Sequence, residues 1–121
     1  FQIDCFNNIN ESQQKLVDEA DVVLIDEGHF FADLVKFCDT CADQGKQVIV
    51  AGLDADYQKE PFRIVTDLAA KANEYIKLKA ICTQCGDWAN FTKRLTQDDG
   101  EKEKVGGLEM YEARCRVCWK V

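Results

Sequence analysis

The sequence contains no apolar run that approaches about 18 residues, the length from which a transmembrane helix is suspected. No signal-peptide pattern is visible either. Positive charge is in deficit, since 15 lysine and arginine residues stand against 22 acidic ones and give a net charge of −7. This balance argues against broad electrostatic attraction to nucleic acid or to an anionic membrane. We therefore expect a soluble, cytoplasmic protein with neither of these partners.

The cysteines do not have the pattern of a secreted disulfide framework. There are seven, an odd number, which favours a reducing compartment. Cys38 and Cys41 form a CxxC pair, but both lie on the apolar face of a predicted helix. This position favours packing in a core over redox chemistry.

Two further CxxC pairs lie in the last third of the chain, Cys82 with Cys85 and Cys115 with Cys118. Together they supply the four thiolates of a structural Zn²⁺ site. Such a closed site leaves no coordination position for a substrate, so the metal would stabilise a fold and take no part in chemistry. The alternative is two unrelated pairs that form disulfides or redox dithiols. Residues 86–114 lie between the two pairs, and this segment is long enough to form a loop that covers a ligand.

Alternating strand and helix patterns predict an α/β fold. Three segments have strand patterns. Residues 22–25 are a continuous apolar run typical of a buried parallel strand, residues 47–53 indicate a second buried strand, and residues 75–81 alternate as a third. Three helices are expected: one ending at Glu19 after a cap at Asn10 or Ser12, one from Phe30 to a terminating Gly45, and one opened by Pro61. This order implies right-handed crossovers and a parallel sheet with flanking helices. We expect a partial α/β core over residues 1–80 and a zinc-binding domain over 81–121.

Acidic residues follow the first two predicted strands. Asp26 and Glu27 come directly after the first strand, and Asp54 follows the second. Ligands of parallel sheets bind beyond the carboxyl ends of the strands, so these carboxylates are expected at one edge. There Glu27 suits a general base for a substrate hydroxyl, and Asp26 suits Mg²⁺, directly or through water. The alternative is a strand end with solvated acids.

Several motifs extend this pattern along essentially the whole chain. They are Ile25-Asp26-Glu27-Gly28-His29-Phe30-Phe31, Val50-Ala51-Gly52-Leu53-Asp54, Gln58-Lys59-Glu60-Pro61-Phe62, both late CxxC pairs, Thr92-Lys93-Arg94-Leu95, Gly106-Gly107 and Tyr111. In this order they resemble the zinc-containing thymidine kinases of the cellular and poxviral type. The resemblance implies a P-loop-kinase-like fold. It also implies ATP-dependent phosphorylation of the thymidine 5′-hydroxyl to dTMP, a salvage step for DNA synthesis.

The resemblance also implies roles for individual residues. Glu27 matches the catalytic base, and Asp26 the acid that supports Mg²⁺. The expected nucleoside-binding residues are Phe30, Phe31, Phe62, Thr92, Arg94, Lys104, Val105, Gly106, Gly107 and Tyr111.

In the family, the segment between the CxxC pairs forms a lasso over the nucleoside and contacts the thymine edge through backbone groups near Gly107. Phe62 and Tyr111 match residues that enclose the thymine ring, and Thr92 one near its methyl group. His29 stands where the family frequently has glutamine, and we expect a tolerated substitution and not a zinc ligand.

Simpler interpretations stand beside these roles. Phenylalanines at the starts of predicted helices are typical core residues. Tyr111 beside a zinc knuckle is explained equally by packing on the metal site. Lys93 and Arg94 are consistent with a solvated pair, and residues 98–104 with a mobile surface loop.

The family has a GxxxxGK[ST] phosphate-binding loop before these motifs, and this sequence contains none. The strand that would carry the loop is also missing, and the first residue is Phe1 and not methionine. We therefore expect the C-terminal part of a thymidine kinase, inactive alone, whose ATP phosphates are held by residues outside this chain. The resemblance further implies a homotetramer and dTTP as a possible feedback ligand.

Two other functions remain as alternatives. The first is a non-catalytic, zinc-stapled module that binds a nucleoside or a partner protein. The second is a DExH-type ATPase, because Asp26-Glu27-Gly28-His29 after an apolar strand also fits that magnesium motif. The chain lacks the remainder of a helicase core, which makes the second alternative the weaker one.

Overall fold

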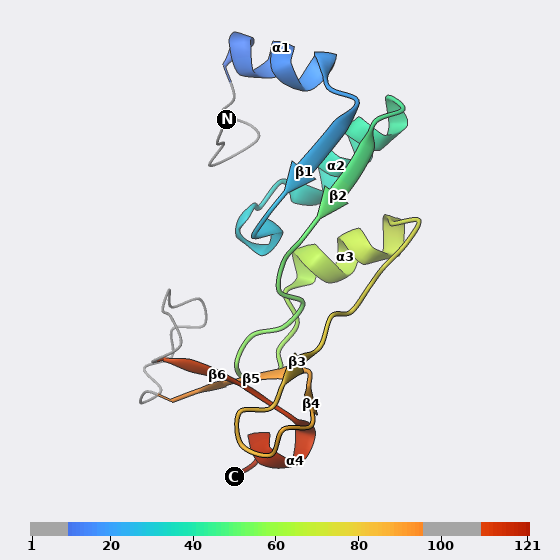
Figure 1. Cartoon of the computed structure of the whole chain (residues 1–121). Coiled ribbons are helices and arrows are strands. Elements are labelled where there is room, and N and C mark those ends of the chain that lie inside the picture. The colour runs from blue at the N-terminus through green and yellow to red at the C-terminus, as the bar shows by residue number, and fades with distance from the viewer. Residues whose placement is uncertain (1–9, 96–109) are drawn as a thin grey trace. The chain divides into compact units, whose positions relative to one another are not determined.

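The computed structural model describes residues 10–95 and 110–121 (Figure 1). Contacts group these residues into two compact units. The first unit contains residues 10–54 and 62–74, and the second contains 55–61, 75–95 and 110–121. The predicted domain boundary between residues 80 and 81 stays a prediction, and the contacts place 75–80 and the 55–61 loop with the cysteine-bearing residues.

The first unit is a small α/β arrangement around one parallel strand pair. Its elements are α1 (Glu11–Glu19), β1 (Val22–Ile25), the 3-10 helix η2 (Gly28–Phe30), α2 (Leu34–Asp43), β2 (Gln47–Val50) and α3 (Arg63–Lys71). Strand β1 pairs with β2 in parallel, with Val22 opposite Gln47 and Ile25 opposite Val50. The predicted α/β class and parallel pairing of the first two strands are therefore confirmed.

The helices of this unit begin and end where local sequence provides caps. The Asn10 side chain accepts the Gln13 N–H, and the Gln13 side chain accepts the Asn10 N–H, which together form a capping box for α1. After α2, Gly45 takes a φ of 84°, the left-handed conformation that a terminating glycine adopts without strain. These two predictions are confirmed.

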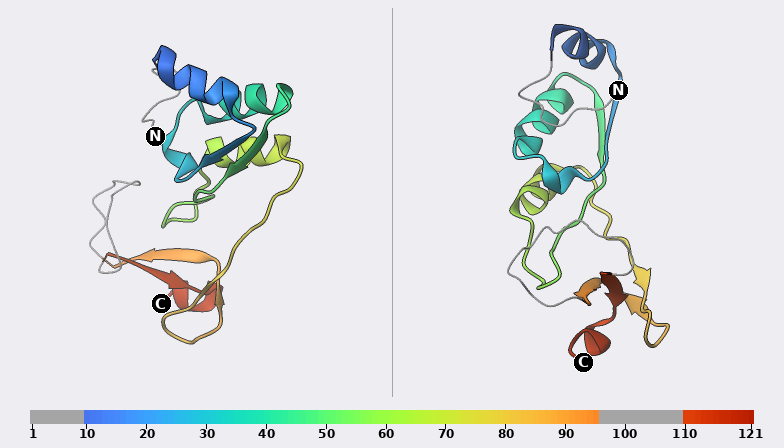
Figure 2. Two further views of the ribbon diagram at one scale, coloured as in Figure 1. Left: turned by 45° about the horizontal axis from the view of Figure 1, so that its top comes forward. Right: turned by 90° about the vertical axis from the view of Figure 1, so that its left-hand side faces the viewer.

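The core of the first unit lies between the strand pair and the helices α2 and α3, which occupy the same side of the strands (Figure 2). Ile25, Leu34 and Cys38 are buried there, with partly buried neighbours from both strands and from α3. On the opposite face, Leu24 is 72% exposed and Ile49 is 50% exposed. The prediction of buried strands with flanking helices is therefore wrong for this face, since among the described residues the helices cover only the other one.

Two predicted boundaries are also wrong. Helix α2 begins at Leu34 and not at Phe30, because the chain first makes the 3-10 turn of η2. Strand β2 ends at Val50, because backbone groups beyond it bond to the loop after β1: the Ala51 carbonyl accepts from Gly28 N–H at 2.9 Å.

The predicted third parallel strand over 75–81 does not form. Residues 75–79 are exposed and outside any strand, and only Ala80–Ile81 forms a strand, β3. That strand pairs antiparallel with β4 (Trp88–Ala89) of the second unit. An alternating pattern becomes a parallel strand only where a neighbouring strand completes its hydrogen bonds.

The second unit consists of short antiparallel pairs and one short helix. Besides β3 and β4 it contains β5 (Phe91–Arg94), β6 (Tyr111–Arg114) and α4 (Arg116–Trp119). Strands β5 and β6 pair antiparallel. The loop 55–61 closes on itself through a bridge between Ala55 and Pro61. None of the helices within 10–95 and 110–121 has the length and hydropathy needed to cross a bilayer.

Candidate functional site

The turn after β1 presents two carboxylates beyond the end of the strand. Asp26 and Glu27 are both exposed, and the Asp26 Oδ1 accepts the Glu27 N–H at 2.9 Å. Glu27 has a φ of 52°, a left-handed conformation that is uncommon for a residue other than glycine, asparagine or aspartate. Residues held in such conformations cluster at functional sites. The strained backbone of Glu27 therefore agrees with its prediction as a catalytic base.

Gly28 allows the turn after β1 to approach β2. A Cβ added there would lie 2.7 Å from the Val50 Cγ1 and 3.2 Å from the Leu34 Cδ2. Gly28 therefore has no room for a side chain, and its N–H donates to the Ala51 carbonyl. The residues after both strands are thus joined at the carboxyl edge.

His29 lies at this edge, in contact with residues that follow both strands. Its side chain is buried, with 4% of the residue exposed. The Leu53 N–H donates to His29 Nδ1 at 3.1 Å, and His29 Nε2 lies 3.5 Å from the Glu27 Oε2. The sequence predicted only a tolerated substitution at His29. It did not predict these contacts, because only the fold brings the partners of the ring together.

The predicted aromatic residues of the first unit have different surroundings. Phe30 is 50% exposed, and its ring centroid lies 4.2 Å from that of His29. The Phe62 ring centroid lies 5.0 Å from His29 on another element, at the start of α3. Phe31 instead packs against the hydrophobic core. Phe30 and Phe62 are thus brought to the same histidine.

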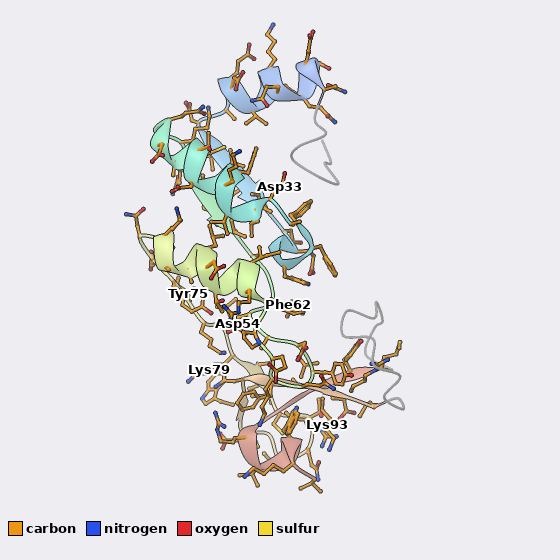
Figure 3. All side chains as sticks on the ribbon, turned by 180° about the vertical axis from the view of Figure 1, so that it is seen from behind. Asp33, Asp54, Phe62, Tyr75, Lys79 and Lys93 are labelled. Atoms are coloured by element: carbon orange, nitrogen blue, oxygen red, sulfur yellow. The ribbon has the colours of Figure 1, made fainter. Side chains whose placement is uncertain are left out.

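Asp54 lies beside Phe62 at the start of α3 (Figure 3). The Asp54 carbonyl accepts the Phe62 N–H at 2.9 Å. Asp54 therefore follows β2 at the same end of the first unit as the turn after β1, as expected for parallel strands.

Four sulfur atoms gather in the second unit. The Sγ atoms of Cys82, Cys85, Cys115 and Cys118 all lie within 4.8 Å of one another, so the cluster could hold a metal ion. The Sγ atoms of Cys85 and Cys115 are 3.7 Å apart. None of the six described cysteines forms a disulfide. The prediction that the two CxxC pairs converge on one site is confirmed.

Backbone amides favour thiolates in this cluster. The Cys115 N–H, bonded to the Cys82 sulfur, lowers the pKa of Cys82 to about 6. The Cys118 N–H, which donates to Cys115 Sγ at 3.4 Å, likewise lowers the pKa of Cys115. Hydrogen bonding to the Cys115 sulfur keeps the proton on Cys118 and raises its pKa to about 12. The thiolate forms of Cys82 and Cys115 are thus favoured, and their negative charge suits a cation.

Side chains of strand β6 bond to Thr83 and Gln84, the two residues between the cysteines of the first CxxC pair. The Thr83 hydroxyl donates to the Glu112 Oε2 at 2.9 Å. Arg114 donates from Nε to the same oxygen at 2.9 Å and bonds the Gln84 side-chain oxygen through its guanidinium. Strand β6 leads directly into Cys115. These side-chain bonds therefore link the two cysteine pairs, in addition to the contact between their sulfur atoms.

Arg94, Thr92 and Tyr111 lie on the β5–β6 pair. Arg94 is 8% exposed, so the interpretation as a solvated pair with Lys93 is wrong for Arg94. Its guanidinium Cζ lies 5.0 Å from the ring centroid of buried Tyr57. Tyr111 lies opposite Arg94 in the strand register, at the end of β6 away from Cys115.

The remaining predicted nucleoside-binding residues, Lys104, Val105, Gly106 and Gly107, lie outside the described residues. The others divide between the two units: Asp26, Glu27, Phe30, Phe31 and Phe62 in the first, and Thr92, Arg94 and Tyr111 in the second. Their roles stay predictions.

The 55–61 loop holds residues that the sequence pattern did not single out. The buried Asp56 accepts from the Gln58 and Glu60 N–H groups at 2.8 and 2.9 Å. Lys59, with a φ of 67°, places its Nζ over the rings of Phe91 and Trp119. Burial, followed by the charges of Arg116 and Lys120, lowers the pKa of Lys59. No local pattern predicts this contact, because its partners lie far along the chain.

Comparison with known proteins gives a consistent result. The family model described as thymidine kinase matches residues 2–119. The chain is 43% identical over 113 residues to a thymidine kinase of Yaba monkey tumor virus, covering 93% of this chain and 61% of the viral one. It is 42% identical to thymidine kinase 1 of Dictyostelium discoideum, covering 93% of this chain and 49% of the other. A Variola virus thymidine kinase is 42% identical, with 85% and 58% covered. The chain thus spans about half to three fifths of the length of these curated relatives.

Proposed function

Because the chain belongs to the thymidine kinase family, we propose that its protein transfers the terminal phosphoryl group of ATP to the 5′-hydroxyl of thymidine. The observation that carries this proposal is the position of Glu27. Its exposed carboxylate lies at the carboxyl end of β1, on a strained backbone and beside a buried imidazole. Such an edge is where α/β proteins bind ligands.

In the proposed reaction Glu27 takes the proton of the 5′-hydroxyl. The hydroxyl oxygen forms a bond to the γ-phosphorus as the bond from that phosphorus to the β,γ-bridging oxygen breaks, which gives dTMP and ADP. General-base catalysis of this kind contributes about 10²- to 10⁴-fold to a rate. The exposed side chain of Glu27 suits this role, because the carboxylate must reach a hydroxyl that is not part of the protein.

Asp26 is the residue proposed to support Mg²⁺. Asp26 is exposed, and its Oδ1 accepts the Glu27 N–H. Carboxylate oxygens are ligands that Mg²⁺ or its bound water prefers. When bound, Mg²⁺ would neutralise charge on the transferred phosphate.

The donor site requires residues that this chain does not supply. Its 121 residues contain no GxxxxGK[ST] run. We therefore propose a P-loop-kinase-like fold in the complete protein, with the ATP phosphates held outside this chain, and little activity from these residues alone.

Zn²⁺ is the metal proposed for the four cysteines. Zn–S bonds of about 2.3 Å in a tetrahedron place two sulfurs about 3.8 Å apart. The 3.7 Å between Cys85 and Cys115 Sγ agrees with that spacing. A four-sulfur site is closed, so Cys82, Cys85, Cys115 and Cys118 would hold a structural ion without a reaction step.

The nucleoside-binding residues are proposed from the family resemblance. Phe30 and Phe62 offer aromatic faces, and Thr92, Arg94, Tyr111 and the backbone of 104–107 would complete the thymine site. Cytoplasmic location, a homotetramer and dTTP as a feedback ligand are also proposed, and they rest on the family resemblance alone.

The test is phosphoryl transfer to thymidine by the complete protein, expressed with any residues that flank this chain. The Glu27→Gln variant should lower kcat by about 10²- to 10⁴-fold, because the amide cannot accept the proton. Glu74→Gln changes another exposed carboxylate and should leave kcat unchanged. Full activity of Glu27→Gln would overturn the assignment. Thymidine binding without transfer by the wild-type protein would favour the non-catalytic module.

A further inference from the structure

The two imidazole nitrogen atoms of His29 lie near different groups. Nδ1 accepts the Leu53 N–H at 3.1 Å. A ring nitrogen that accepts a hydrogen bond carries a lone pair and no proton, so the neutral ring must carry its proton on Nε2. The backbone of the residues after β2 therefore selects the tautomer.

The protonated nitrogen faces the candidate base. Nε2 lies 3.5 Å from the Glu27 Oε2, and the Glu27 side chain is 62% exposed. Nε2–H can therefore donate toward one carboxylate oxygen while the other oxygen remains accessible to a substrate. Catalytic contacts of this kind are often long in the absence of ligand and shorten when it binds.

Packing fixes the ring in this orientation. The rings of Phe30 and Phe62 lie against it, with centroids 4.2 and 5.0 Å away. The backbone approaches closely as well, since a Cβ added at Gly52 would lie 3.3 Å from His29 N and 3.4 Å from His29 Nδ1. The imidazole is thus held by two aromatic rings, a backbone N–H and the approach of Gly52.

We infer that His29 is a positioning residue that orients the Glu27 carboxylate through its Nε2–H. This inference rests on the proposed function, in which Glu27 is the base. An exposed glutamate samples several rotamers, and anchoring one oxygen leaves the second directed at the substrate hydroxyl. His29 neither gains nor loses a proton in the reaction: the hydroxyl proton passes to the free Glu27 oxygen, and Nδ1 stays bonded to Leu53.

Substitutions separate orientation from simple packing. Glutamine also offers an N–H donor and an oxygen acceptor, so His29→Gln should keep kcat within a few-fold of the wild-type value. His29→Leu fills a similar volume without either group and should lower kcat by on the order of tenfold to a hundredfold, with KM changed much less. Equal kcat values for the Leu, Gln and wild-type proteins would overturn the inference.

A spectroscopic measurement on the folded wild-type protein does not depend on the stability of His29→Leu. With ¹⁵N-labelled histidine in the complete protein, and the His29 signal assigned by its loss in His29→Gln, the ring should show a protonated Nε2 and an unprotonated Nδ1. The Nε2–H resonance should shift in Glu27→Gln. A ring protonated at Nδ1, or an Nε2–H resonance unaffected by Glu27→Gln, would contradict the inference.

The outcomes distinguish the two proposals. If the complete protein transfers no phosphate to thymidine, or does so without Glu27, the proposed function fails whatever the tautomer of His29. If transfer depends on Glu27 and His29→Leu retains full kcat, only the positioning role fails.

Discussion

Lys59 Nζ lies 4.0 Å from the ring centroid of Trp119 and 4.4 Å from that of Phe91. Trp119 follows Cys118 directly, and its indole N–H donates to the Thr92 carbonyl at 2.9 Å. The 55–61 loop is therefore attached to the second cysteine pair and to β5 through one lysine and one tryptophan. The loop and the cysteine cluster are therefore linked by direct contacts within the second unit.

Substitution of Lys59 tests this attachment. Lys59→Met keeps an apolar stem of similar length but removes the charge that the aromatic faces attract. We expect a lower thermal unfolding midpoint for the variant and a change in Trp119 fluorescence. Lys59→Arg keeps the cation and should preserve both properties. Wild-type behaviour of the methionine variant would show that the cation–π contact contributes nothing measurable.

Removal of a cysteine ligand tests the proposed zinc site. Cys82→Ser or Cys118→Ser should lose bound Zn²⁺ and destabilise the second unit, because three thiolates no longer close the tetrahedron. The measurement is zinc content per chain, with thermal unfolding beside it. Cys38→Ala is the matched control, since Cys38 is buried in the core of the first unit and should leave zinc content unchanged. Full zinc in either serine variant would refute the four-cysteine site.

Two glycine substitutions compare a crowded position with an open one. Gly28→Ala places a methyl group 2.7 Å from Val50 Cγ1, and overpacking of this kind costs about 1 to 3 kcal/mol. It should also displace the turn that carries Glu27 and lower kcat. Gly45→Ala meets no atom within 4 Å, but its φ of 84° is unfavourable for alanine by about 1 kcal/mol.

Urea unfolding and kcat measured on both variants give the comparison. Gly45→Ala should lose stability without losing kcat, because it lies at the end of α2 away from Glu27. A Gly28→Ala variant with wild-type kcat would show that the turn tolerates the extra methyl group without moving the carboxylate.

Local patterns account for much of the fold and of the site. The cap at Asn10, the terminator at Gly45 and the strands at 22–25 and 47–50 depend on neighbouring residues, which the sequence displays directly. The four cysteines were predictable for a related reason, because each CxxC spacing already places two sulfurs on one metal.

Contacts between distant residues were not predictable in this way. His29 depends on Leu53 and Phe62, and Lys59 depends on Phe91 and Trp119, so each arrangement exists only after the chain has folded. The strand expected over 75–81 failed for the opposite reason. Its alternating pattern was present, but among the described residues no parallel neighbour pairs with it.

The pH dependence of stability should report the bonds that Glu112 makes. Hydrogen bonds from Arg114, and then from Thr83, hold the pKa of Glu112 below its ordinary value of 4.5. A carboxyl group whose pKa is lower in the folded state stabilises that state fully above its unfolded pKa, and the contribution is lost as the pH falls through the folded value. Wild-type protein should therefore exceed Glu112→Gln in thermal midpoint at neutral pH, and the difference should shrink as the pH falls below 4.5.

The difference between the two proteins isolates Glu112, because both carry the same cysteines and would lose any metal bound to them in acid alike. Glu11→Gln, on an exposed first turn of α1, is a control that should follow the wild-type curve closely. A constant gap between wild type and Glu112→Gln across this pH range would mean that the carboxylate charge does not act through Arg114. The bonds from β6 to Thr83 and Gln84 would then hold the first cysteine pair by geometry alone.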